Sequence, residues 1–143
     1  MLERFPELLQ SAARAIALGS TRAVELGALL IGNLAFHETA HAVLSGMDID
    51  VTRLVGIMIE GGDRARELST LALANLTRTE KVAKQVAAAE GGMEVILSVG
   101  ESGATGRARE AAERVIANCA IHRLKSKGVT MPLGKAKSCS EHT

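Results

Sequence analysis

The residues with the clearest capacity for chemistry are His37, Glu38 and His41, because their spacing matches that of a zinc-binding helix. Two histidines four positions apart lie one helical turn apart and can share a zinc ion, while the glutamate serves as general base. This arrangement requires one continuous helix through residues 37–41 and a third ligand. A zinc-dependent hydrolase is therefore one hypothesis for the chain.

Two other pairs have the separation of zinc ligands, Cys119 with His122 and Cys139 with His142. Cys119, however, stands at a position that leucine occupies in two similar segments of the chain, which favours a small core residue. We therefore expect the chain to bind no metal and no other cofactor. The alternative is a metal site formed by His37 and His41.

Three segments of the chain, 22–35, 64–77 and 107–120, share the same residues at several matching positions. Each segment begins with an arginine, and a glutamate and an asparagine follow at fixed distances. The repeated residues are Arg22, Arg64 and Arg107, then Glu25, Glu67 and Glu110, then Asn33, Asn75 and Asn118. The asparagines are 42 and 43 residues apart, and this period is typical of helical repeat arrays.

Each repeated segment has the pattern of one amphipathic helix. Its apolar and small residues form a stripe about 100° wide around the helix axis, which suits burial. The Arg, the Glu, the Asn and the residue four positions before the Asn share a separate face. That residue is Leu29, Leu71 or Arg114. Since this face is repeated, we expect these twelve residues to contact a partner.

Shorter helices are predicted between the long ones, because glycine residues follow each helical run and act as stop signals. The predicted ranges are 7–18, 38–44, 51–59, 80–89 and 93–99. No segment has a strand pattern. The sequence thus predicts an all-α fold of just under three units, roughly 6–37, 38–79 and 80–122.

With these motifs the chain resembles the armadillo-repeat family, whose third helix ends in a motif like Ala-Leu-x-Asn-Leu-Ala. Here the motif reads Leu-Ile-Gly-Asn33-Leu-Ala, Ala-Leu-Ala-Asn75-Leu-Thr and Val-Ile-Ala-Asn118-Cys-Ala, and residues 90–93 resemble the family's Gly-Gly junction. The resemblance implies a right-handed α-solenoid in which the third helices line a concave groove and the asparagines grip the backbone of an extended peptide. Members that bind nuclear-localisation segments carry Trp where Leu29, Leu71 and Arg114 stand here, so import cargo is not implied.

Two interpretations of the repeated asparagines stay open. An Asn amide can pair with both groups of a ligand's peptide bond, or it can satisfy neighbouring carbonyls within the fold. The arginines lie near helix N-termini, where positive charge opposes the helix dipole. Three roles stay open for these arginines: they orient the glutamates, they contact an acidic partner, or they are inherited by duplication.

Composition narrows the function further. The chain has 143 residues, 47% of them hydrophobic, with two Phe and no Trp or Tyr. Without aromatic platforms for bases, we expect no nucleic-acid binding. The longest apolar stretch, 28–36, is too short to span a membrane. Few cysteines and no N-terminal signal predict a cytoplasmic protein, with the nucleus as the alternative.

The two ends of the chain carry separate expectations. Residues 123–143 have five Lys or Arg against Glu141 and lack helical apolar spacing, so they are predicted to form a disordered basic tail. At the other end, Leu8, Leu9 and Ile16 are expected to be covered by a partner or a second copy. The sequence as a whole predicts a non-enzymatic scaffold or adaptor that holds a protein or an extended peptide.

Overall fold

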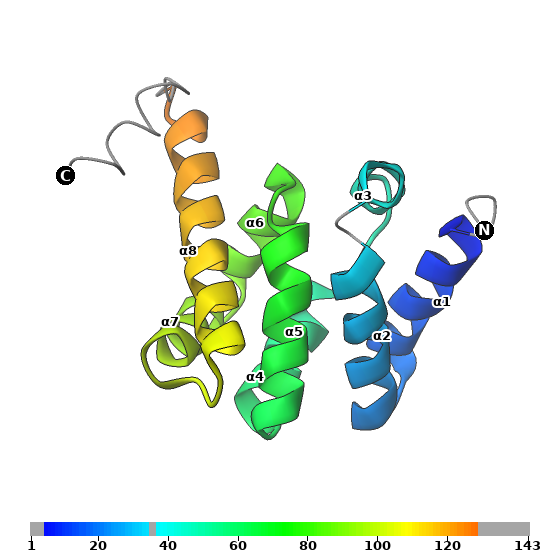
Figure 1. Ribbon diagram of the computed structural model, residues 1–143. Helices are drawn as coiled ribbons and strands as arrows, with labels where there is room; N and C mark the ends of the chain where they lie inside the picture. Colours follow the sequence, from blue (N-terminus) through cyan, green and yellow to red (C-terminus); the bar gives the residue numbers. More distant parts are fainter. Residues whose placement is uncertain (1–4, 35–36, 129–143) are drawn as a thin grey trace.

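The computed structural model describes residues 5–34 and 37–128. Over these residues the chain forms eight helices joined by short connections, with no strand. This confirms the predicted all-α class. Figure 1 shows the elements in order. They are α1 (Phe5–Leu18), α2 (Thr21–Leu34), α3 (Glu38–Ser45), α4 (Val51–Glu60), α5 (Asp63–Leu76), α6 (Glu80–Ala88), α7 (Gly92–Ser102) and α8 (Gly106–Ser126).

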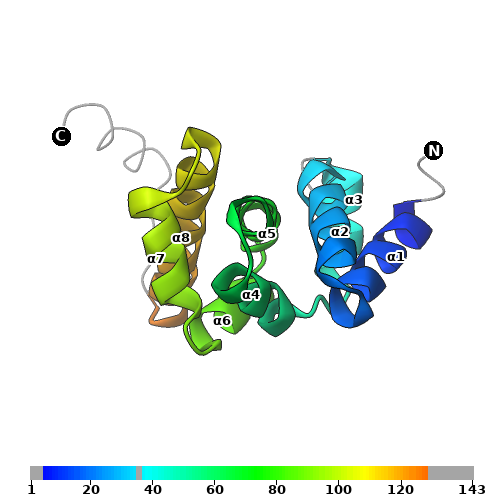
Figure 2. The ribbon, with the colours of Figure 1, turned by 90° about the horizontal axis from the view of Figure 1, so that it is seen from below.

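The three repeated segments form the long helices α2, α5 and α8, which stand side by side, with α5 in contact with both neighbours. Seen from below, they make the inner row of an arc, and α1, α4 and α7 lie on its outer side (Figure 2). The order short, intermediate, long occurs in α3–α5 and again in α6–α8. Residues that recur along the sequence therefore meet across neighbouring long helices.

Two helices run further than the glycine and charge patterns predict. Helix α7 continues through Gly100 to Ser102, because a single glycine weakens a helix interior without ending it. Helix α8 continues to Ser126, so residues 123–126 belong to the helix and the predicted basic tail begins later. Arg123 and Lys125 in its last turn interact favourably with the helix dipole. Residues 129–143 lie outside the described part of the chain.

Helix α5 forms the centre of the core. Nine of its fourteen residues are buried, compared with four of the twenty-one in α8. Two arginines bind backbone carbonyls at helix ends. These carbonyls have no donor within their own helix. Arg66 Nε donates to Met58 O at the end of α4 (2.7 Å), and Arg109 Nη1 donates to Gly103 O after α7 (2.7 Å). These arginines occupy the same repeat position, so the same joint is built twice.

The N-terminal end differs from expectation. Leu9 and Ile16 are fully buried within the chain and Leu8 is half-buried, because α1 packs against α2, α3 and α4. For Leu9 and Ile16, the cover that was expected from a partner comes from the chain itself. Leu18, at the end of α1, is a large hydrophobic residue that is 79% exposed. Among the described helices, none has both the length and the apolar character needed to cross a membrane.

Candidate functional site

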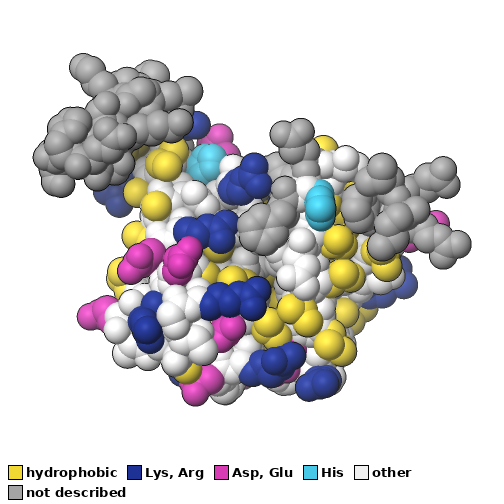
Figure 3. Space-filling view, viewed as in Figure 1, with side chains coloured by type: hydrophobic (Ala, Val, Ile, Leu, Met, Phe, Trp, Pro, Cys, Tyr) yellow, Lys and Arg dark blue, Asp and Glu magenta, His cyan; other side chains and the backbone are white. Residues whose placement is uncertain are grey.

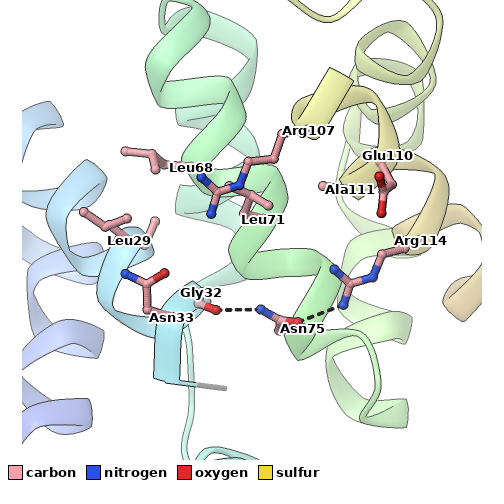
Figure 4. A pocket seen from close by; sticks show the side chains of 11 residues that line it. Leu29, Gly32, Asn33, Leu68, Leu71, Asn75, Arg107, Glu110, Ala111 and Arg114 are labelled. Atoms are coloured by element: carbon pink, nitrogen blue, oxygen red, sulfur yellow. Dashed lines mark hydrogen bonds between the residues drawn. The ribbon is translucent and has the colours of Figure 1, made fainter. Parts of the chain in front are cut away.

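A cavity of about 390 Å³ opens between the three long helices, and we call it the central cavity. Figure 4 shows its lining side chains, which come from α2, α5 and α8. Seven of the twelve predicted partner-binding residues lie here: Leu29, Asn33, Leu71, Asn75, Arg107, Glu110 and Arg114. Helices far apart in sequence thus bring most of the predicted face to one site.

Asn75 holds the centre of this site together. It is only 2% exposed. Its Nδ2 donates to Gly32 O (2.8 Å), and its Oδ1 accepts a hydrogen bond from Arg114 Nη2 (2.9 Å) (Figure 4). Gly32 lies in the last turn of α2, where carbonyls lack intrahelical donors. Asn75 therefore connects all three long helices and orients Arg114 beside the cavity.

Asn118 repeats this joint one unit later. Its Nδ2 donates to Ala74 O in the last turn of α5 and to Thr77 Oγ1, both at 3.1 Å. Asn33 differs, since its side chain is exposed at the cavity and makes no hydrogen bond within the described residues. Of the two roles left open by the sequence, Asn75 and Asn118 have the structural one. Asn33 alone presents its amide outward.

The repeated Arg and Glu residues also divide between joints and exposed positions. Glu25 lies 3.7 Å from the Nε atom of Arg64, across α2 and α5. Glu67 accepts a hydrogen bond from Thr105 Oγ1 at the start of α8 (2.9 Å). Arg22, Arg107 and Glu110 are exposed, and the last two border the central cavity. The charged rim of this cavity therefore comes from α8, which supplies Arg107, Arg114 and Glu110.

The predicted face did not include Leu68 and Ala111, which line the floor of the central cavity. Both lie seven positions before the repeated Asn, where the first segment has Leu26. Residues seven and three positions apart share one helix face, so an apolar residue in all three copies was the available signal. Leu68 and Ala111 thus add apolar surface to that of Leu29 and Leu71 from the predicted face.

The zinc alternative depends on the backbone at His37. This residue precedes α3 with an extended conformation (φ −82°, ψ 133°). The helix therefore begins after it, as the predicted range 38–44 implies, and does not run through residues 37–41 as the zinc site requires. The side chains of Glu38 and His41 lie outside the described part of the chain. Among the described residues, no three His, Cys, Asp or Glu side chains are grouped to hold a metal ion.

The second metal alternative involved Cys119 and His122. Cys119 is half-buried with its Sγ 3.8 Å from Ala83 O, and burial raises the pKa of its thiol. His122 Nε2 lies 3.1 Å from Arg78 O. Both side chains thus contact backbone carbonyls of neighbouring elements. Cys139 and His142 lie outside the described residues.

Comparison with known proteins adds no assignment. The chain matches no family model, no curated protein and no solved structure. The residues and geometry of the central cavity are therefore the basis for inferring a function.

Proposed function

We propose that this chain is an armadillo-type α-solenoid of just under three repeats that holds a partner polypeptide and has no catalytic role. The partner docks in the central cavity between α2, α5 and α8. The observation that carries this proposal is the convergence of seven repeated-face residues from three helices on one cavity. Repeated residues that served packing alone would not need to border an open cavity.

The lining of the cavity suits a peptide. Leu29, Leu68 and Leu71 offer an apolar floor that can bury a side chain of the partner. Around it, Arg107 and Arg114 supply donors for carbonyl or carboxylate oxygens, and the Asn33 amide supplies both a donor and an acceptor. An extended peptide presents these same groups at short intervals along its backbone.

The same lining favours binding over hydrolysis. Among its residues Glu110 is the one carboxylate, and it holds no His, Cys, Ser, Thr or Lys. General acid–base and nucleophilic catalysis usually need two such groups within hydrogen-bond reach of one another. Asn75, by fixing Arg114, preorganises a charged donor, which lowers the entropic cost of binding.

Selection from a displayed library of random peptides tests the proposal. We expect the wild-type chain to enrich peptides that share a motif. The exposed Arg107→Glu variant should bind the selected peptide about tenfold more weakly, because one charged contact at the cavity is reversed. Lys125→Glu is the matched control, since it makes the same charge change on α8 outside the cavity. No enrichment, or equal affinity for Arg107→Glu and wild type, would refute the proposal.

A further inference from the structure

The side of α8 that faces away from α5 is covered less than the equivalent side of α5. At the end of α5, Leu73, Ala74, Leu76 and the following Thr77 are all buried. Their counterparts one repeat later are Ile116, Ala117, Cys119 and Ala120, which are half-buried or exposed. The described residues thus leave an apolar side of α8 open where a further element would pack.

This open side forms a second groove of about 580 Å³, which we call the C-terminal groove. Ala83, Ala87 and Ala88 of α6 and Ile116 and Ala120 of α8 are among its apolar lining residues. It shares no residue with the central cavity. In Figure 1, α6 and α8 stand next to each other toward the end where the chain leaves α8.

Helix α8 ends at a left-handed glycine next to Lys127, which lines this groove. Gly128 has a left-handed backbone (φ +82°), and its N–H donates to Lys125 O (3.0 Å). Such a glycine ends a helix and reverses the chain, and the residue after it commonly packs on the last helical turn. Leu124 in that turn is 37% exposed.

The residues that follow Gly128 have the pattern and length to fill the groove. They read Val129-Thr130-Met131-Pro132-Leu133, with apolar side chains at every second position, so an extended segment presents all three on one face. Five extended residues span about 17 Å. The lining of the groove on α8 reaches from Lys127 back to Ile116, which at 1.5 Å per helical residue is also about 17 Å.

We propose that residues 129–133 dock in the C-terminal groove as an extended segment and cover the open side of α8. Val129, Met131 and Leu133 face α6 and α8, while Thr130 and Pro132 face solvent. Pro132 fits this role because a segment that docks through its side chains needs no donor from its backbone nitrogen at that position.

Labelling of Cys119 by a maleimide tests the docking, because this thiol lines the groove. In a full-length Cys139→Ser background, Met131→Asp should raise the labelling rate by roughly ten- to a hundredfold, the factor that corresponds to losing the burial of one large apolar side chain. Thr130→Asp is the matched control and should leave the rate unchanged. Equal rates for the two variants, or slow labelling that depends on protein concentration, would overturn the proposal, the latter in favour of a second copy.

A cross-link provides a measurement that does not require the Asp variant to fold. In a background of Cys119→Ser and Cys139→Ser, Ala87→Cys combined with Met131→Cys should form an intramolecular disulfide at least several times faster than Ala87→Cys combined with Thr130→Cys. Equal rates for the two pairs would show that the segment does not present Met131 to the groove, and the proposal would fail.

Discussion

At the scale of single residues, the repeated asparagines show how one side chain serves the joint between helices. An α-helix leaves the carbonyls of its last turn without intrahelical donors. Asn75 supplies a donor to such a carbonyl on α2, and Asn118 does the same on α5. No earlier copy of the repeated segment precedes Asn33 in the described chain, and its side chain is exposed. The same residue type at one repeat position thus has two roles.

This difference predicts opposite outcomes for two identical substitutions. Asn75→Ala should lower the free energy of unfolding by about 1–3 kcal/mol, because Gly32 O and Arg114 lose their buried partner. Asn33→Ala should change it by less than about 0.5 kcal/mol, as is usual at exposed positions. Urea denaturation of both variants measures the effect. Similar values for the two would contradict the structural role of Asn75.

At the scale of elements, α1 and α2 pack closely at Gly27. A Cβ atom at this position would lie 2.8 Å from Ala12 O and 3.2 Å from Ile16 Cγ1. The glycine therefore permits an approach between the two helices that alanine would prevent. Gly56 in α4 is different, since a Cβ atom there would meet no atom within 4 Å.

Alanine substitution should accordingly have opposite signs at the two glycines. Gly27→Ala should destabilise the fold by about 1–3 kcal/mol through overpacking between α1 and α2. Gly56→Ala should stabilise it by about 0.5–1 kcal/mol, because alanine has the better helix propensity and nothing opposes its methyl group. Thermal and urea unfolding of the pair decide the point. A stabilised Gly27→Ala variant would mean that the helices do not approach so closely.

At the scale of the whole molecule, α5 is the element on which the others depend. It lies between α2 and α8, contacts α4, and has the largest buried share among the long helices. Helices α1 and α2 and helices α7 and α8 form the two sides of the arc around it (Figure 2). Charged side chains are spread over the face formed by the long helices, with apolar patches between them (Figure 3).

Native-state hydrogen exchange should reflect this arrangement. We expect the amides in the middle of α5 to exchange most slowly, with opening free energies near that of global unfolding. The last turns of α8 should exchange faster, because Ile121 and Leu124 are partly exposed and few residues of that helix are buried. Equal protection in α5 and in the last turns of α8 would contradict a core centred on α5.

The sequence by itself determined the helices, because helix formation follows local periodicity and stop signals. The spacing of apolar residues within 64–77 predicted α5 to within one residue at each end. The repeated columns also identified seven of the residues at the central cavity. Local signals were weak at Gly100 and in residues 123–126. There the predicted C-terminal ends of α7 and α8 were wrong.

Only the tertiary structure decided which repeated residues form joints and which remain exposed. Asn33, Asn75 and Asn118 occupy the same repeat position, yet their surroundings depend on whether an earlier copy of the repeated helix lies beside them. The burial of Leu9 and Ile16 was decided in the same way, by contacts of α1 with α2, α3 and α4. Periodicity specifies the face of a helix on which a residue lies. What that face meets depends on non-local packing, which a residue's neighbours in sequence do not encode.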